Sequence, residues 1–571
     1  MLDFYKGMDL SFVPEYLDNG LVTYDLDGTP LPPLALAKKY GVNSIRLRIW
    51  HSPERIPESR GYCSLFHTLA MAKQIKEYGL HFLLDFHYSD YWADPAQQRK
   101  PKDWENYSFE ELKEAVFHYT KDTLAALKRE NALPDMVQIG NEIRSGFLFP
   151  DGEVPHYSQM VELINAGIDG AREIGGNNLQ IMIHLDQGGR YFYLKEWLDN
   201  VFDNGIRDFD VLGLSYYPFW HGTFTDLKET MSQLIERYHK PIILAETAHA
   251  WRLSQKGFID KAQEKIAGIP ATPQGQKKVL DLVMNITASL PHKMGMGIYY
   301  WEPFCLPKEG EGGWAENMGL LDPNGRVMEG IESFLFTREK SCPQKIAKIY
   351  EPHDIEVLIG ENYQLPVTLN ALYYDGSIRA LPVYWTDSDI SCSWTQQAGT
   401  KIFNGKIKDW EQSVTIKVIA AEKIDSVKNL LTDTNWEQGL TCWNIEKSKD
   451  TLSQIHPDFV ESFPAPPINA LRIESVKNFH FSLSQELTRC EKGNYLLTAE
   501  YLGTDTTNVD IRLYLEDEHQ RKEIIIHPTE HEWQTFSVLL EKQSKGFLRA
   551  GLQITAPPVY GMVRKFTLIK R

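Results

Sequence analysis

Two glutamates follow short apolar runs, and carboxylic acids in that position can do chemistry. Glu142 comes just after the run 136–140, and Glu246 directly follows the run 242–245. Short continuous apolar runs are typical of buried parallel strands, so each carboxylate is expected at the C-terminal end of a strand. A single glutamate there would more often begin a solvated loop. A pair supplies what glycoside hydrolysis needs, a proton donor for the leaving oxygen and a group that attacks the anomeric carbon or activates water.

The elements that position these glutamates form a regular alternation between residue 4 and about residue 335. Between the apolar runs lie segments such as 108–130 and 274–289, whose apolar residues recur at spacings of three and four. Eight strand-helix units of this total length predict a (β/α)8 TIM barrel. A doubly wound open sheet is the alternative, although no Gly-rich phosphate loop follows the first run. The predicted strands are 4–9, 44–49, 82–86, 136–140, 179–183, 211–215, 241–245 and 297–300.

In a barrel of this type, chemistry belongs at the C-terminal ends of the strands. A cation near a nucleophilic carboxylate keeps it ionised, and Arg46 and Arg48 are the candidates on the second strand. Both have the same parity, so strand alternation does not decide between them. The other polar and aromatic residues at strand ends are Asp9, Ser11, Trp50, Asp85, His87, Tyr88, Asp90, Asn141, His184, Asp186, Tyr216, Tyr217, Trp220, His249, Trp301 and Glu302.

Several of these residues also have structural interpretations. His87 and His184, taken singly, are more typical of structural histidines. Tyr216 and Tyr217 could be core aromatics that cap the barrel. The acidic loop 85–94 lacks the regular alternation of a calcium loop, so no metal site and no cofactor are predicted.

Composition limits the class of partner. The 571 residues predict about three domains. With 77 acidic and 60 basic residues the net charge is −17, which argues against nucleic acid or an anionic membrane and fits a neutral substrate. No apolar run reaches the roughly 18 residues of a membrane span. The six scattered cysteines indicate neither a zinc site nor a disulfide scaffold. A monomer is expected. Localisation stays open: extracellular or at the cell surface if a signal peptide was removed, cytoplasmic if Met1 is the native start.

The barrel portion resembles glycoside hydrolase family 53, the endo-β-1,4-galactanases of a large retaining clan. The matching motifs occur in the family's order from residue 7 to residue 303. They are GMDLS (7–11), IRLRIW (45–50), DFHYSDYWADP (85–95), QIGNE (138–142), IHLDQGG (183–189), GLSYYPFWHG (213–222), ETAH (246–249) and YYWEP (299–303).

This resemblance implies hydrolysis of β-1,4-galactan, the side chain of pectic arabinogalactan, with Glu142 as acid/base and Glu246 as nucleophile. The implied mechanism is double displacement with retention, for which the two carboxyl groups lie roughly 5–5.5 Å apart. The implied substrate-binding residues are Asp9, Arg48, His87, Trp92, Asn141, His184, Tyr216, Trp220 and Trp301. Some bacterial members carry an Asp-x-Asp-x-His-x-Asn calcium loop after the nucleophile. The stretch 250–273 lacks this pattern, so no calcium is expected there and product length stays open.

After about residue 340 the pattern changes to alternating apolar residues with turn signals, typical of all-β domains. With residues 1–340 as the catalytic barrel, residues 345–421 resemble a bacterial immunoglobulin-like spacer, with a hairpin signal at Asp375-Gly376 and Trp385 as a core residue. Residues 425–571 fit a jelly-roll β-sandwich and resemble carbohydrate-binding modules, including the galactan-binding family 61. Its candidate stacking platforms, each more often a core residue, are Trp436, Trp443 and Trp533.

Three other functions are compatible with parts of this pattern. A related clan member acting on mannan, xylan or cellulose would share both glutamates, although the motifs at 85–95 and 213–222 favour galactan. A non-catalytic galactan-binding protein would be expected to lack one glutamate, and both are present. Transglycosylation is open to any enzyme that forms a covalent glycosyl intermediate.

Overall fold

The structure is a computed structural model in which the chain forms two compact units. The first comprises Met1–Ala347 with Leu372–Ser377, and the second comprises Lys348–Ala371 with Ile378–Arg571. The structure describes residues 2–254, 256–257, 259, 261–307, 310, 312–350, 355–359, 365–386, 397–421, 429–431, 443–447, 454–460, 468–475, 479–503, 510–527, 533–556 and 559–570. Among these residues, no helix combines the length and apolar composition needed to cross a bilayer.

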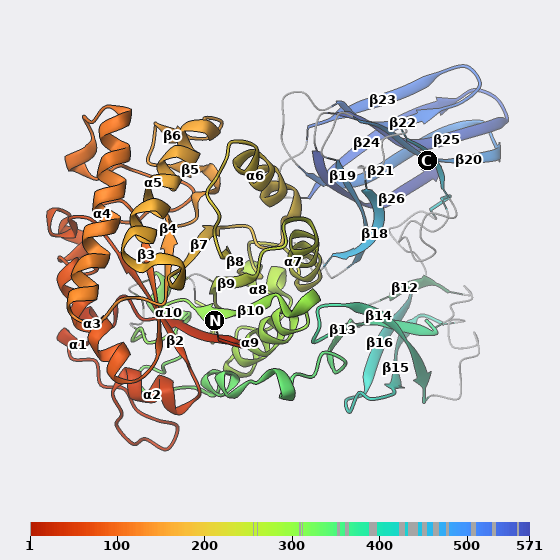
Figure 1. Ribbon diagram of the computed structural model, residues 1–571. Helices are drawn as coiled ribbons and strands as arrows, with labels where there is room; N and C mark the ends of the chain where they lie inside the picture. Colours follow the sequence, from red (N-terminus) through yellow and green to blue (C-terminus); the bar gives the residue numbers. More distant parts are fainter. Residues whose placement is uncertain are drawn as a thin grey trace. The chain divides into compact units, whose positions relative to one another are not determined.

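Eight parallel strands close into a barrel in the first unit, which confirms the predicted fold class (Figure 1). Nearly every residue of these strands is buried, because the barrel interior covers one face and the helices cover the other. In barrel order the strands are β1 (Tyr5–Asp9), β2 (Ser44–Ile49), β3 (His81–Phe86), β4 (Met136–Ile139), β7 (Gln180–Leu185), β8 (Val211–Ser215), β9 (Ile242–Thr247) and β10 (Gly295–Tyr300).

Helices follow the strands, and their sequences explain where they begin and which face they bury. In α4 the Ser108 side chain accepts from the Glu111 backbone N–H, and the Glu111 side chain accepts in return from Ser108, a capping box. The buried stripe of α4 includes Leu112, Val116 and Leu124, at the spacing of one helix face. The helices of this unit are α1 (Val13–Asp18), α2 (Pro33–Lys39), α3 (Leu65–Glu77), α4 (Phe109–Arg129), α5 (Tyr157–Gly175), α6 (Tyr191–Asp203), α7 (Phe224–Tyr238), α8 (Lys261–Ala267), α9 (Pro273–Ala288) and α10 (Trp314–Asn317).

Short elements complete the loops between strands and helices. The 3-10 turns are η1 (Pro53–Arg55), η2 (Pro57–Ser59), η3 (Lys102–Trp104), η4 (Ile143–Ser145), η5 (Gly176–Asn178), η6 (Pro291–Lys293), η7 (Glu329–Leu335) and η8 (Arg338–Lys340). A small two-stranded sheet, β5 (Gly146–Phe147) with β6 (Gly152–Glu153), lies between β4 and α5.

The N-terminal half of the barrel interior is filled by apolar side chains. Tyr299 occupies the space over Gly7, where a Cβ would lie 2.1 Å from the Tyr299 ring. The cluster consists of Tyr5, Leu83, Met136, Met182, Val211, Ile243, Ala245 and Tyr299. Because this layer closes one end of the barrel, the polar side chains further along the same strands gather at the C-terminal end.

A six-stranded, mostly antiparallel sheet follows the barrel along the chain, and most of its residues belong to the second unit. Its order is β11-β13-β14-β15-β16-β12, and β13 and β14 flank the predicted turn at Asp375-Gly376. Trp385 packs against Phe403 and neighbouring core residues, and its indole N–H donates to the Pro366 carbonyl at 2.9 Å. The strands are β11 (Ile346–Ile349), β12 (Ile355–Leu358), β13 (Thr368–Tyr373), β14 (Ile378–Trp385), β15 (Gly399–Ile407) and β16 (Val414–Ala421).

Two five-stranded antiparallel sheets follow and pack on a shared apolar core, as expected for a β-sandwich. One sheet has the order β17 (Asn444–Lys447), β20 (Phe479–Cys490), β25 (Gly546–Ala556), β22 (Asp510–Glu516), β23 (Arg521–Ile526). The other has the order β18 (Gln454–Val460), β19 (Ile468–Ser475), β26 (Val559–Lys570), β21 (Gly493–Gly503), β24 (Gln534–Lys542).

The tryptophans predicted as stacking platforms have different surroundings in this sandwich. Trp443 is a core residue, with its ring 5.4 Å from that of Phe566. Trp533 is half-buried and lies 4.0 Å from the Arg564 guanidinium. Trp436 lies outside the described residues. The spacer and carbohydrate-binding roles, and the predicted boundaries at 345–421 and 425–571, stay predictions.

Candidate active site

A cleft of about 610 Å³ opens at the C-terminal ends of the barrel strands. Both predicted catalytic glutamates line it. The remaining lining residues are Phe12, His87, Trp92, Ala93, Asp94, Pro95, Gln97, Asn141, Asp186, Tyr217, Trp220, His221, Trp301 and Trp314. Five tryptophan and phenylalanine rings beside carboxylic acids make this a surface suited to a sugar chain, because apolar ring faces stack and carboxyl groups do proton chemistry.

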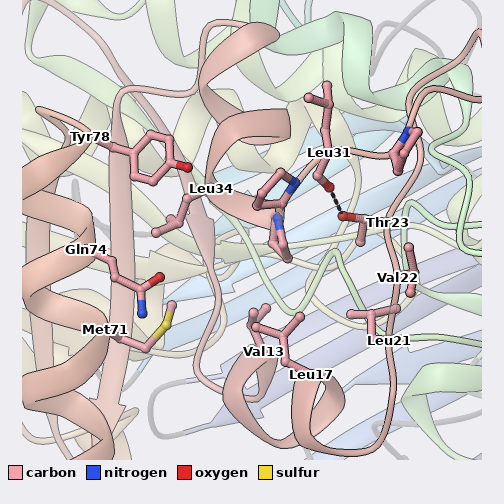
Figure 2. A pocket seen from close by; sticks show the side chains of 13 residues that line it. Val13, Leu17, Leu21, Val22, Thr23, Leu31, Leu34, Met71, Gln74 and Tyr78 are labelled. Atoms are coloured by element: carbon pink, nitrogen blue, oxygen red, sulfur yellow. Dashed lines mark hydrogen bonds between the residues drawn. The ribbon is translucent and has the colours of Figure 1, made fainter.

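A second hollow of about 370 Å³ lies among α1, α2 and α3 (Figure 2). It is lined mainly by aliphatic side chains such as Leu17, Leu34 and Met71. No carboxylic acid is among its lining residues, so the acid/base chemistry belongs to the cleft.

Glu142 reaches the cleft through an unusual backbone path after β4. Gly140 has φ +80°, and a Cβ there would lie 2.6 Å from the Ile143 side chain. Glu142 itself is left-handed at φ +48°, a conformation that costs a non-glycine residue of the order of 1–3 kcal/mol. Its backbone N–H donates to Nδ1 of His184 at 3.4 Å. The turn lifts the Glu142 side chain out of the strand direction and into the cleft.

Glu246 lies near the end of β9 and is held by two donors. The pairing of β8 with β9 shifts register after Leu214, which places Ser215 opposite Glu246. The Arg46 guanidinium lies 3.0 Å from one carboxylate oxygen of Glu246, and the hydroxyl of Tyr217 donates to the other at 3.0 Å. A cation and a hydroxyl at these distances favour the ionised form of this carboxylate.

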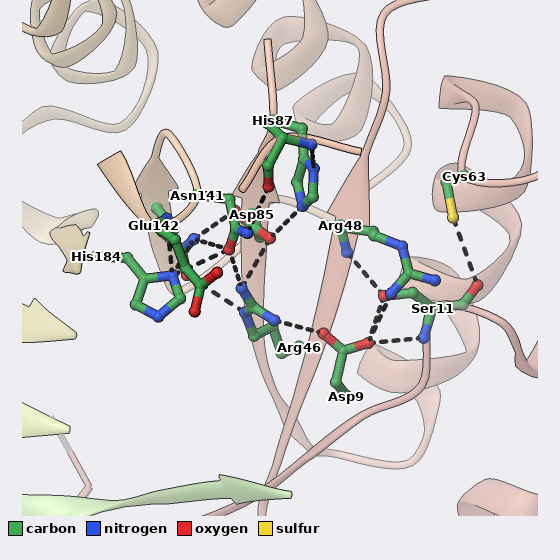
Figure 3. Close-up of polar contacts among 12 residues, drawn as sticks. Asp9, Ser11, Arg46, Arg48, Cys63, Asp85, His87, Asn141, Glu142 and His184 are labelled. Atoms are coloured by element: carbon green, nitrogen blue, oxygen red, sulfur yellow. Dashed lines mark hydrogen bonds and ion pairs between the residues drawn. The ribbon is translucent and has the colours of Figure 1, made fainter. Parts of the chain in front are cut away.

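Arg46 is the centre of a buried polar network (Figure 3). Its guanidinium donates at 2.8 Å to Asp9 on β1 and to Asp85 on β3, and at 2.9 Å to Asn141 after β4. Burial raises the pKa of Asp85, but Arg46 and His87 outweigh it and hold that pKa below its usual range. Arg46 therefore connects three strands to Glu246 and answers the question that strand parity left open.

Arg48 also points into the barrel, as its equal parity requires, but it contacts a different acid. Its Nη1 donates at 2.7 Å to Glu302, directly after β10, and lies 3.8 Å from Asp9. The arginine beside Glu246 is thus Arg46. The resemblance implied Arg48 as a substrate-binding residue, and that role stays a prediction. The two arginines have the same parity on β2, so their spacing in the sequence does not determine that one reaches Glu246 and the other Glu302.

The two tyrosines of the motif at 213–222 have different surroundings, and the resemblance implied Tyr216 as a substrate-binding residue. Tyr216 is fully buried outside the cleft, and its hydroxyl donates to the Gly222 carbonyl at 3.0 Å. Tyr217 lines the cleft and contacts Glu246. Successive residues leave a strand in opposite directions, so the two tyrosines of one motif have different environments.

Replacing Tyr217 by Phe is expected to lower kcat by about tenfold to a hundredfold, since a hydrogen bond to a charged group contributes about 1.5–3 kcal/mol. Tyr216→Phe is the matched control and is expected to change kcat by less than about threefold. Steady-state kinetics on the two variants checks this. Equal losses in both would contradict the assignment of Tyr217 to Glu246.

The two predicted histidines have separate positions in the network. His87 lines the cleft, its Nδ1 accepts from the Ala93 backbone N–H at 3.0 Å, and its Nε2 lies 3.1 Å from Asp85. His184 is buried below the cleft, 2.9 Å from the Ser215 hydroxyl. Burial, together with Arg46, lowers the pKa of His184 well below its usual value, so this ring is neutral.

Sequence reasoning missed Gln138, a buried polar residue within β4. Its amide nitrogen donates to Asp85, to the Gly140 carbonyl at 3.0 Å and to His184 at 3.1 Å. Its amide oxygen accepts from Arg46 at 3.3 Å. A glutamine inside an otherwise apolar strand was the available signal, because a buried amide needs partners in the barrel interior.

The aromatic residues of the cleft agree in part with the resemblance. Trp92, Trp220 and Trp301 line the cleft, and Trp220 is 41% exposed. Phe12 and Trp314, which follow β1 and β10, line it as well and were not predicted. Trp314 lies edge-on to Trp301 with 4.4 Å between ring centroids. Loop residues of this kind lack periodicity, so only the folded chain identifies them.

Asp9 and Asn141 lie within the network of Arg46. Asp9 is fully buried and does not line the cleft. Its carboxylate accepts hydrogen bonds from the Arg46 guanidinium and from the Ser11 hydroxyl. The Asn141 amide donates to the Ala93 carbonyl at 2.9 Å, and its side chain borders the cleft beside Glu142. These contacts fix the direction of Asn141 toward any ligand in the cleft.

The two glutamates have different surroundings, and these raise the pKa of Glu142 more than that of Glu246. Burial raises the pKa of Glu142 well above its usual value, and the charges of Glu246 and Asp186 raise it further. Burial also raises the pKa of Glu246, to about 7, while Arg46 and the Tyr217 hydroxyl oppose the rise. Glu142 therefore keeps its proton to higher pH than Glu246 does, which is the division that an acid and a nucleophile require.

In the loops after β9 and β10, polar contacts join the two segments. Lys256 donates to the Gly310 carbonyl at 2.9 Å, and the Gly313 N–H donates to the Lys256 carbonyl at 3.0 Å. Across the part of the chain that the structure describes, no group of three or more His, Cys, Asp or Glu side chains could hold a metal ion. Gln255, Phe258 and Asp260 of the stretch 250–273 lie outside it.

The barrel, the two glutamates at strand ends and the aromatic cleft define a glycoside hydrolase. The sequence profile of glycosyl hydrolase family 53 matches residues 5–334, and that of bacterial Ig-like domains of group 4 matches residues 350–410. The chain belongs to glycosyl hydrolase family 53.

Named relatives and a solved structure resemble the same region. An uncharacterized protein from the bgaB 5′ region of Niallia circulans is 40% identical over 58% of this chain and 93% of its own length. An arabinogalactan endo-β-1,4-galactanase of Cellvibrio japonicus is 33% identical over 58% of this chain and 90% of its own length. The Ignisphaera aggregans GH53 catalytic domain is 37% identical with a TM-score of 0.55, covering 59% of this chain and 97% of that domain.

Proposed function

We propose that this protein is a retaining endo-β-1,4-galactanase in which Glu142 is the acid/base and Glu246 the nucleophile. The observation that supports these roles most directly is the unequal environment of the two glutamates. Arg46 and Tyr217 both contact the carboxylate of Glu246. Glu142 has the negative charges of Glu246 and Asp186 near it, and both raise its pKa. A nucleophile must be ionised and a general acid protonated, so the assignment follows the charges.

The mechanism uses each group in turn. Glu246 attacks the anomeric carbon of a galactosyl residue while Glu142 donates its proton to the leaving oxygen, O4 of the next residue. A galactosyl ester of Glu246 results, and Glu142 is now ionised. Glu142 then takes a proton from water, which attacks the anomeric carbon and releases Glu246. Two displacements at one carbon give net retention.

The family and the cleft support a β-1,4-galactan substrate. Named relatives are endo-β-1,4-galactanases, among them proteins of Cellvibrio japonicus and Bacillus subtilis. The aromatic side chains of the cleft suit the faces of several sugar residues, and the net charge of −17 fits a neutral polymer. An endo-acting enzyme cleaves internal bonds of a polysaccharide that extends through its cleft. Long oligosaccharides are therefore expected among the first products.

Hydrolysis assays on linear polysaccharides test this function. Reducing-sugar release and product length are measured on β-1,4-galactan, with β-1,3-galactan, mannan and xylan as controls. We expect release from β-1,4-galactan alone, with long oligosaccharides before short ones. Activity on another polymer without activity on β-1,4-galactan would overturn the substrate, and inactivity on all four would favour a binding protein.

A further inference from the structure

The guanidinium of Arg48 lies against the aromatic side of the cleft. Its central carbon is 3.9 Å from the ring centroid of Phe12 and 4.3 Å from that of Trp92. Both rings line the cleft, and Trp92 also packs against Trp301, with 5.9 Å between centroids. We call Phe12, Trp92 and Trp301 the aromatic wall. A cation over an aromatic ring is attracted by the negative charge of the ring face, more strongly where water is excluded.

Arg48 itself is fixed by one carboxylate. Its Nη1 donates to Glu302 at 2.7 Å, and the two side chains are 1% and 3% exposed. Within the described residues, the Nε and Nη2 atoms of Arg48 have no hydrogen-bond partner. The position of this buried cation therefore depends on Glu302, on the more distant Asp9 and on the ring faces.

The contacts join four separate strand ends. Arg48 lies on β2, Glu302 follows β10, Phe12 follows β1 and Trp92 follows β3. Trp301, directly before Glu302, belongs to the same wall. Arg48 therefore contacts rings from two different loops, Phe12 and Trp92, and its partner Glu302 adjoins the third ring, Trp301.

We propose that Arg48 and Glu302 form a positioning pair that holds the aromatic wall in place for sugar binding. The pair does not serve the nucleophile, since Arg46 and Tyr217 occupy both oxygens of Glu246. The two arginines of β2 thus have separate tasks, Arg46 in the chemical step and Arg48 in binding. This inference rests on the proposed function.

The position of the aromatic wall matters for binding because galactose has one apolar ring face. Its axial O4 lies on one face of the ring and leaves hydrogens on C3, C4 and C5 toward the other. That apolar face packs on an aromatic ring, and dispersion contacts weaken steeply when a ring moves by 0.5–1 Å. Displaced rings would weaken binding of each stacked residue and leave the two glutamates in place.

The test compares variants that keep size or charge. Arg48→Lys keeps the charge but loses the planar group that stacks on rings, and Glu302→Gln keeps the shape but removes the carboxylate. On β-1,4-galactan oligosaccharides we expect each to raise KM by about tenfold and to change kcat by less than about threefold, the signature of lost binding that is equal in the ground and transition states. Arg46→Lys is expected to lower kcat by about a hundredfold or more instead.

Arg172→Lys provides the matched control, because Arg172 pairs with Asp210 at 2.8 Å and does not line the cleft. It should leave KM within about twofold. An unchanged KM in folded Arg48→Lys and Glu302→Gln would overturn the proposal, and so would a loss of kcat equal to that of Arg46→Lys. Circular dichroism verifies folding, since removal of one partner of a buried ion pair is strongly destabilising.

If the buried variants do not fold, Phe12→Leu replaces them, because Phe12 is only half-buried. It removes one ring beside Arg48, and the same rise in KM is expected, whereas no change would overturn the inference. Failure of the proposed function looks different: the wild type would then be inactive on galactan. In that case the same KM comparison applies to the polymer that the wild type does cleave.

Discussion

Replacing Glu246 by Gln is expected to lower kcat on β-1,4-galactan by about 10⁴-fold or more, since removal of a catalytic nucleophile typically has effects of this size. The amide keeps the shape of the side chain and its contact with Tyr217, but it does not form a glycosyl ester. Arg46 would lose the carboxylate at 3.0 Å. Reducing-sugar release over several hours, with protein checked by circular dichroism, measures the loss.

Azide tests the role of Glu246 independently. In Glu246→Ala the space vacated by the carboxylate admits a small anion, which is expected to restore cleavage and to give the α-galactosyl azide by attack on the face that Glu246 used. Glu500→Gln is the control for the same chemical change, because Glu500 pairs with Arg564 at 2.7 Å in the second unit. A β-galactosyl azide, or residual kcat above about a tenth of wild type in Glu246→Gln, would contradict the nucleophile assignment.

Replacing Glu142 by Gln is expected to lower kcat on β-1,4-galactan by about 10²–10⁴-fold, the usual contribution of general acid/base catalysis. A nitrophenyl galactooligosaccharide should form the covalent intermediate at nearly the wild-type rate, because its leaving group needs no proton. A pre-steady-state burst of nitrophenol measures this step. Equal losses of galactan cleavage and of the burst rate would contradict a role for Glu142 as acid.

The same variant changes the pH dependence of kcat/KM. As pH falls through the pKa of Glu246, the nucleophile becomes protonated and the rate falls. As pH rises through the pKa of Glu142, which burial and the Glu246 charge raise, the acid is lost and the rate falls again. Wild type should therefore give a bell with both limbs above the ordinary carboxyl range. Glu142→Gln should keep the acid limb and lose the basic limb, since an amide does not titrate.

The barrel followed from patterns that are local in the chain. Each predicted strand lies within about two residues of an observed one, because a strand buried on both faces needs a continuous apolar run wherever it occurs. The positions of Glu142 and Glu246 followed in turn, since parallel strands in a closed barrel all end on the same side. Motif resemblance then indicated the family, which the matched region 5–334 confirms.

The partners of these glutamates did not follow from the sequence. Arg46 and Arg48 have equal parity and equal burial, yet one reaches Glu246 and the other Glu302. Of the two adjacent tyrosines in one motif, Tyr217 donates to Glu246, whereas Tyr216 donates to the Gly222 carbonyl. Gln138 contacts Asp85 and His184, which come from two other strands far away in the sequence.

The sequence by itself determined the fold class, the strand ends and the two carboxylic acids, because apolar periodicity and its interruptions are properties of neighbouring residues. Only the tertiary structure decided which cation and hydroxyl hold Glu246, and which residues form the aromatic wall. Those contacts join side chains on β2 and β9 with side chains in the loops after β1, β3, β8 and β10. Their distances depend on barrel closure and on the register shift beside Glu246, and neither quantity is encoded in the spacing of any single segment.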